Sequence, residues 1–291
     1  MPRRAALLLP LAGLAALAGA PARAQVPPPV PPPAPVPAPV PAPAPPVPAN
    51  PCERPELALR CPNLVMRRPY AFALRRTASG GAVLAATNAI VNVGPGPLEL
   101  RGRRVARKRM QVRQVLRGER TGQPRVEPHA GTIEYYDTRS RGVYWKYEHA
   151  ARFELWRMDA AGNPVEHRRD GPKLDYCFRD LRRVRRLSDG RPYARSPPGR
   201  RFGACNPVAG TRAVTLGTSV GWADIYPSGY PQNWISVGGL RGCFLYVLRV
   251  DPLHQIFETH EDDNAAARVV RLPWRGDGRH GCPAPTRMPA A

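Results

Sequence analysis

Short strand-like runs that end at glycine or proline are the feature that most constrains the fold of this chain. Residues 82–93 are apolar with many small side chains, and the run stops at the Gly-Pro-Gly-Pro segment 94–97, a strong breaker of regular structure. No segment shows a long 3.6-residue apolar period with helix caps. This pattern predicts an all-β fold, namely an antiparallel β-sandwich with long loops. The further runs that we expect to form strands are 98–100, 110–116, 142–155, 243–250 and 267–272.

The amino terminus has the three parts of a secretory signal peptide. Basic residues at 1–4 precede a short apolar run at 7–20, and Ala22-Arg23-Ala24 is a small-x-small cleavage sequence. The apolar run is shorter than the ~18 residues that a spanning helix needs. We expect residues 1–24 to be a signal peptide, with an uncleaved amino-terminal anchor as the alternative, and no transmembrane segment after cleavage. The protein is then secreted or held in the cell envelope, in an oxidising compartment.

Residues 25–51 form a linker that consists almost only of Pro, Ala and Val. They hold 15 of the 38 prolines and no charged residue. Such a segment favours an extended polyproline conformation and acts as a semi-rigid spacer. We expect one domain over residues 52–282, long enough to bury a hydrophobic core, and a tail over 283–291.

Six cysteines in an exported chain predict three disulfides that staple the domain. The sequence alone allows many pairings. Cys52 and Cys61 bracket a short segment, and Cys177 and Cys205 stand at the ends of an Arg-rich connection. We therefore expect the pairs Cys52–Cys61 and Cys177–Cys205, which leave Cys243 to pair with Cys282.

The charge of the chain is strongly positive. The formal net charge is +22, and three arginines leave with the signal peptide. Clusters of arginine at 101–104, 107–109 and 182–186 favour anionic partners such as cell-envelope polymers or extracellular proteins. In an exported protein we expect no nucleic acid partner. Arginine on solvated faces, without any partner, is the alternative.

The segment 141–156, Arg-Gly-Val-Tyr-Trp-Lys-Tyr-Glu-His-Ala-Ala-Arg-Phe-Glu-Leu-Trp, resembles the copper-binding strand of the lysyl oxidase family. That strand reads roughly H-x-H-W-H, an aromatic residue, and then A-R-Y-E-L. Trp145 and the segment 151–155 match it, but Gly142, Tyr144 and Lys146 stand where the family has its three histidines. Residues at i, i+2 and i+4 share one face of a strand, so three imidazoles there can bind one copper ion.

None of the three residues at these positions suits copper. Glycine offers no ligand, a phenol ionises only near pH ~10, and an ammonium group repels a dication. His149 points to the other face of an unbroken strand, and a bulge is the alternative that would re-aim it. The remaining histidines show no metal-ligand spacing, and we expect no metal here. They are His129, His167, His254, His260 and His280.

Two further segments resemble the family. Residues 171–180 are similar to its G-x-K-x-x-F-C-L-x-D segment, and residues 217–226 to its G-x-S-x-G-W-x-D-x-Y segment. The resemblance places Lys173 and Tyr226 at the positions that cross-link into lysine tyrosylquinone. This cofactor can form from Lys173 and Tyr226 only if copper binds. Asp224 could face the same pocket and act as a base; a structural carboxylate is the alternative. A loop lysine and a packed tyrosine are the alternatives for Lys173 and Tyr226.

The resemblance covers roughly residues 62–272 and implies a mostly β fold. The matching segments include Asn63-Leu64-Val65, 92–100 and 258–264. Within the last of these, Glu261-Asp262-Asp263 could bind calcium, but it lacks the oxygen spacing of a known loop, which favours a solvated turn.

Three functions follow from these patterns. The family activity is copper- and quinone-dependent oxidative deamination of peptidyl lysine or other primary amines. The emptied ligand positions instead favour a secreted family member in which that activity is lost or impaired. The alternative to the amine oxidase is a non-catalytic extracellular module that binds anionic cell-wall or protein partners; different chemistry on the same fold is the third.

Overall fold

Antiparallel strands form nearly all the regular structure of this protein. The computed structural model describes residues 49–137, 142–172, 175–184 and 192–290. The expected signal peptide and nearly all of the linker lie outside these residues, as does Lys173. Every strand pairing between described strands is antiparallel, and the only helices among them are three 3₁₀ turns, so the prediction of an all-β fold is confirmed. These turns are η1 (Pro51–Glu53), η2 (Pro55–Leu57) and η3 (Pro231–Asn233).

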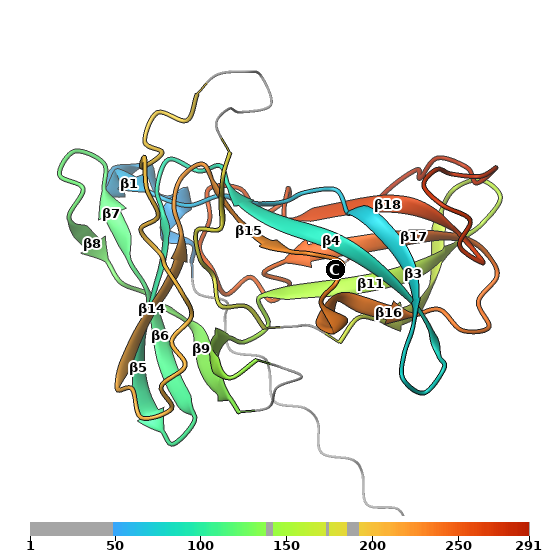
Figure 1. Cartoon of the computed structure of the whole chain (residues 1–291). Coiled ribbons are helices and arrows are strands. Elements are labelled where there is room, and N and C mark those ends of the chain that lie inside the picture. Colours follow the sequence, from blue (N-terminus) through green and yellow to red (C-terminus); the bar gives the residue numbers. More distant parts are fainter. Residues whose placement is uncertain (1–48, 138–141, 173–174, 185–191, 291) are drawn as a thin grey trace, which may run out of the picture. The chain divides into compact units, whose positions relative to one another are not determined.

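Four sheets carry the strands (Figure 1). The six-stranded sheet contains β2 (Leu64–Met66), β3 (Tyr70–Arg76), β4 (Ala82–Asn92), β13 (Arg182–Arg183), β15 (Trp222–Tyr226) and β16 (Trp234–Ser236). The four-stranded sheet has the order β12 (Pro164–Asp170), β11 (Ala151–Met158), β17 (Gly242–Val250), β18 (Ala265–Leu272).

The other two sheets hold the Arg-rich hairpins. The five-stranded sheet has the order β10 (Tyr144–Tyr147), β9 (His129–Tyr136), β6 (Arg109–Gln114), β5 (Leu98–Ala106), β14 (Ala213–Thr218). The smallest has the order β1 (Leu59–Arg60), β7 (Leu116–Gly118), β8 (Pro124–Val126).

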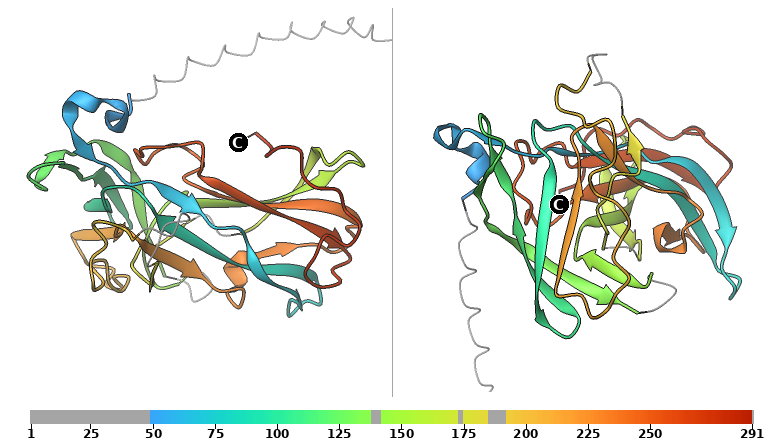
Figure 2. Two further views of the ribbon diagram at one scale, coloured as in Figure 1. Left: turned by 90° about the horizontal axis from the view of Figure 1, so that it is seen from above. Right: turned by 60° about the vertical axis from the view of Figure 1, so that its left-hand side comes forward.

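The main core lies between the six-stranded and four-stranded sheets, which are stacked as a sandwich (Figure 2), and it continues onto the five-stranded sheet. Side chains alternate along a strand, so Leu84, Ala86 and Ile90 of β4 face inward together with Phe244 and Tyr246 of β17. The opposite face of β17 is also covered, because Leu245 and Val247 pack with Cys282 and neighbouring residues. β17 is therefore buried on both faces, which explains why its sequence is almost entirely apolar.

The structure has the three disulfides at the pairs that the spacing suggests. They join Cys52 to Cys61, Cys177 to Cys205 and Cys243 to Cys282, and none of the six cysteines is free. Such a set of disulfides is typical of proteins from an oxidising compartment.

Residues on both sides of the expected domain also form hydrogen bonds with it. The contacts divide the chain after Val47, and the Asn50 amide donates a 2.9 Å hydrogen bond to the Glu258 carbonyl, so the last linker residues belong to the domain. At the carboxyl end, Arg249 on β17 donates hydrogen bonds to the carbonyls of Pro289 (2.5 Å) and Ala290 (3.2 Å). Residues 283–290 are thus attached to the sheet rather than forming a free tail.

No helix in the described ranges is long and apolar enough to cross a membrane.

Candidate functional site

The strand that resembles the copper-binding segment is shorter than expected. β10 begins only at Tyr144, and Gly142 precedes it with φ of +82°. The strand also does not continue into β11, because the chain turns at Glu148 and His149, where His149 has φ of +56°. Gly142 is therefore not on the strand, and His149 is an exposed turn residue rather than a member of either strand face.

The two strand residues at ligand positions do share a face, away from buried Trp145. Lys146 is only 3% exposed, and its Nζ lies 5.0 Å from the ring centroids of both Tyr136 and Tyr144. Cation–π contacts of this kind are stronger when the ammonium is removed from water. The Tyr136 hydroxyl in turn donates a 2.8 Å hydrogen bond to Asp175. An aromatic cage around a buried lysine thus stands where the resemblance puts imidazoles.

A second group of aromatic side chains surrounds Tyr226 of β15. The Tyr226 ring stacks on Tyr176 at a centroid distance of 4.1 Å and an interplanar angle of 10°, and Tyr230 approaches edge-on at 6.3 Å. The Tyr226 hydroxyl donates a 3.0 Å hydrogen bond to Asp224, whose side chain is fully buried. Asp224 and Tyr226 therefore face the same side of β15, as the i, i+2 spacing predicts.

Electrostatics connects the two groups. Burial raises the pKa of Tyr226 well above its ordinary value, and the nearby Asp224, Tyr176 and Tyr144 raise it further. Burial also raises the pKa of Tyr144, with contributions from Tyr230 and Asp224 that Arg179 partly opposes. Tyr144 and Tyr226, which are 82 positions apart in the sequence, thus belong to one tyrosine cluster, which we define as Tyr136, Tyr144, Tyr176, Tyr226 and Tyr230.

The backbone explains why these segments meet. Tyr147 and Tyr176 form an isolated antiparallel bridge, with N–H to O distances of 2.8 and 3.0 Å in the two directions. This bridge holds the segment that follows Lys173 against β10. The Cys177–Cys205 disulfide lies directly beside it. Lys173 itself lies outside the described residues, so the structure does not locate it relative to Tyr226.

The residues at the copper-ligand positions do not fit copper. Gly142 has no ligand atom, and Tyr144 is a phenol whose pKa is raised. The Lys146 Nζ lies between two aromatic rings, 5.0 Å from each centroid. All six histidines are exposed. His254 contacts Glu261 at 3.1 Å, but no histidine belongs to the group of metal-ligating side chains found in the described ranges. Since copper builds the quinone in the resembled family, nothing in this cluster supports conversion of Tyr226.

A second polar cluster lies where β17 and the following loop meet β2. Carboxylate oxygens of Asp251, Glu258 and Glu261 lie within 4.8 Å of one another. The Leu64 amide donates to Glu258, and the Asn264 amide donates to Glu258 and Glu261 at 3.2 Å each. Burial raises the pKa of Asp251 to about 7 and that of Glu258 well above its ordinary value.

Three oxygens beside these carboxylates are buried and receive no hydrogen bond. They are Oδ1 of Asn63, of Asp263 and of Asn264, while the Asn63 amide nitrogen donates to Asp263 at 2.9 Å. Buried acceptors without donors are costly, and carboxylate and amide oxygens are the ligands that calcium takes. We call Asn63, Asp251, Glu258, Glu261, Asp263 and Asn264 the oxygen cluster. Its donor atoms are of the kind that calcium takes, which is the alternative to a solvated turn for the segment 261–263.

Four residues of this cluster are not predicted as ligands from the sequence: Asn63, Asp251, Glu258 and Asn264. The only signal is that the family-like segments 63–65 and 258–264 both contain oxygen-bearing side chains, and nothing in their spacing indicates that they meet.

Comparison of the chain with models of protein families and with curated proteins finds no match. The resemblance to lysyl oxidases therefore rests on the sequence motifs alone.

Proposed function

We propose that this protein is an exported, lysyl-oxidase-like β-sandwich that has lost copper- and quinone-dependent amine oxidation and acts as a binding protein in the cell envelope or outside the cell. The observation that carries the proposal is Lys146, a buried cation in the aromatic cage at a copper-ligand position. A dication and an ammonium group cannot share this site without strong repulsion.

The tyrosine cluster supports a structural role for Tyr226. Its ring is stacked on Tyr176 and its hydroxyl is committed to Asp224. A buried neutral phenol that donates to a carboxylate stabilises the sheet, and Asp224 in this role accepts a hydrogen bond rather than removing a proton from a substrate. The motif around Tyr226 is then retained for packing.

The proposed binding role is supported by the arginine surface and by the disulfides. Ion pairs such as Arg117–Glu99 use only part of the arginine excess, and most described arginines are exposed. A domain with this charge attracts acidic partners over distances up to the Debye length, ~8 Å at physiological salt.

Metal and quinone analysis tests the loss of oxidase chemistry. Full-length protein expressed with copper is expected to contain far less than one copper per chain, to give no redox-cycling quinone stain and to release no peroxide from a lysine-bearing substrate. Stoichiometric copper together with a positive quinone stain would refute the proposal and restore the family activity.

A further inference from the structure

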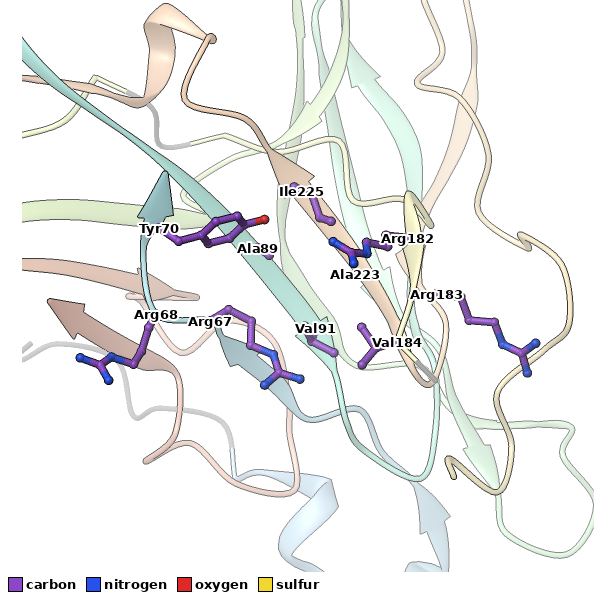
Figure 3. A pocket seen from close by; sticks show the side chains of 10 residues that line it. All are labelled: Arg67, Arg68, Tyr70, Ala89, Val91, Arg182, Arg183, Val184, Ala223 and Ile225. Atoms are coloured by element: carbon purple, nitrogen blue, oxygen red, sulfur yellow. The ribbon is translucent and has the colours of Figure 1, made fainter. Parts of the chain in front are cut away.

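An arginine-lined groove lies on the face of the six-stranded sheet opposite to the tyrosine cluster. Its floor is Ala89 and Val91 of β4 and Ala223 and Ile225 of β15, which are paired across the two strands, and its volume is about 780 Å³ (Figure 3). Because side chains alternate along β15, Ala223 and Ile225 point away from the face that carries Asp224 and Tyr226. The groove is thus separate from the candidate site.

Among the described residues, four guanidinium groups and no carboxylate line this groove. Arg67 and Arg68 follow β2 on one side, and Arg182 and Arg183 form β13 on the other; all four are exposed. Within the described ranges none of the four forms an ion pair, and Arg183 only donates to Ser196, at 3.2 Å to Oγ and 3.4 Å to the carbonyl. No carboxylate of the described residues therefore neutralises the positive charge of these four arginines.

The aliphatic floor of the groove favours anionic ligands that also carry apolar groups. Ile225 and Val184, which are half-buried, provide most of the accessible aliphatic surface between the arginines, because Ala89, Val91 and Ala223 are buried. Burying such a surface contributes to affinity only if the ligand also carries apolar groups, at roughly 25 cal/mol per Å². A fully hydrophilic polyanion, such as a uronate polymer or polyphosphate, would use the arginines and leave the floor in contact with water.

A polypeptide satisfies both features of the groove. Its carboxylates can pair with guanidinium groups in bidentate geometry, and aliphatic side chains between them can contact the floor. An apolar centre with an arginine and tyrosine rim is also typical of protein interfaces, and Tyr70 lies on this rim, 39% exposed.

We propose that this groove binds an acidic peptide segment that carries aliphatic side chains between its carboxylates. The inference rests on the binding role proposed above and assigns it a site and a partner chemistry.

Fluorescence anisotropy with a labelled peptide of alternating Glu and Val residues tests the inference on the full-length protein. The wild type is expected to bind this peptide, and added NaCl is expected to weaken binding. The double variant R67Q/R182Q should lose about tenfold in affinity, or about 1.4 kcal/mol, because it removes two exposed ion pairs with the peptide. The control R241Q/R287Q removes the same charge at two exposed arginines outside the groove and should bind like the wild type. Circular dichroism would verify that both variants fold.

A peptide of alternating Glu and Gly, with the same charge, and alginate, a uronate polymer, test the floor. Both are expected to bind more weakly than the Glu-Val peptide. If either bound as tightly, and lost affinity equally in R67Q/R182Q, the groove would be a general polyanion site and the peptide assignment would be wrong. If the Glu-Val peptide bound R67Q/R182Q and the control alike, the groove assignment would fail while the proposed binding function stood. If the wild type bound none of the three polyanions, both would fail.

Discussion

The conformation of Gly142 determines whether a histidine, and hence a metal ligand, can be introduced at this position. A Cβ at this position would lie 2.5 Å from the Tyr144 ring, and the backbone has φ of +82°. Histidine here would meet both a steric conflict and the cost of left-handed backbone, roughly 1–2 kcal/mol. A histidine at position 142 is therefore opposed by the ring of Tyr144, the residue at the second position of the motif.

Gly142→Ala is expected to lower the free energy of unfolding by more than Gly80→Ala does. Gly80 has nearly the same φ, +81°, with nothing near its Cβ position, so it isolates the conformational cost of about 1 kcal/mol. Urea denaturation of the two variants measures the difference. Equal losses would mean that the Tyr144 ring does not crowd Gly142.

Replacement of Gly142, Tyr144 and Lys146 together by histidine is expected to create copper binding, because the Tyr144 and Lys146 changes remove both the crowding ring and the buried cation. Metal analysis of the purified triple variant would measure about one copper per chain. The variant G142H/Y144H, which keeps Lys146, should bind none. Absence of copper in a folded triple variant would show that these positions are misaligned with the family strand.

At the scale of elements, β17 contributes side chains to the hydrophobic core, and the loop after it carries every residue of the oxygen cluster except Asn63. Calcium is expected to raise the thermal stability of the protein relative to EDTA, by about 2.7 kcal/mol when calcium is 100-fold above its dissociation constant. Glu258→Gln should abolish this gain, since it removes a central buried carboxylate. Asp262→Asn, at an exposed neighbouring position outside the cluster, should retain it. A calcium gain that survives Glu258→Gln would place the ion elsewhere.

The same elements predict an unusual pH dependence in EDTA. The unfolded chain releases the Asp251 proton near pH 4, whereas the folded protein keeps it until about pH 7 because the carboxyl is buried. Stability is therefore expected to fall as pH rises from 4 to 7 and then to level off, by at most roughly 4 kcal/mol from this group. Urea denaturation across this range measures the slope, and Asp251→Asn should flatten it. A slope of the opposite sign would show that the buried carboxyl is already ionised at low pH.

The sequence pattern predicts most strands well, but it does not predict which distant residues come into contact in the fold. Apolar runs such as 82–93 and 243–250 coincide closely with β4 and β17, because a strand buried on both faces needs a continuous apolar run. The turn at His149 and the start of β10 are missed, since a positive φ in a non-glycine residue leaves no compositional signal. Asn63 and Glu258 are 195 positions apart, and only the tertiary fold brings their side chains into one cluster.

At the scale of the whole molecule, the two ends of the chain differ in what they contribute. Residues 1–47 form a separate unit when the chain is divided by its contacts. At the other end, the last residues accept hydrogen bonds from Arg249, which is only 8% exposed and also contacts Glu154 at 3.4 Å. Removing these carbonyls leaves a buried guanidinium short of acceptors.

Deletion of residues 283–291 is therefore expected to lower the free energy of unfolding by about 1–3 kcal/mol, the cost of an unsatisfied buried polar group, although Cys282 and its disulfide remain. Deletion of residues 1–47, about five times as many residues, should leave the melting temperature unchanged. Arg249→Met provides the matched test, because in this variant the carboxyl-terminal deletion should cost less than in the wild type. Equal costs in both backgrounds would show that the carboxyl-terminal residues stabilise the sheet by contacts other than those of Arg249.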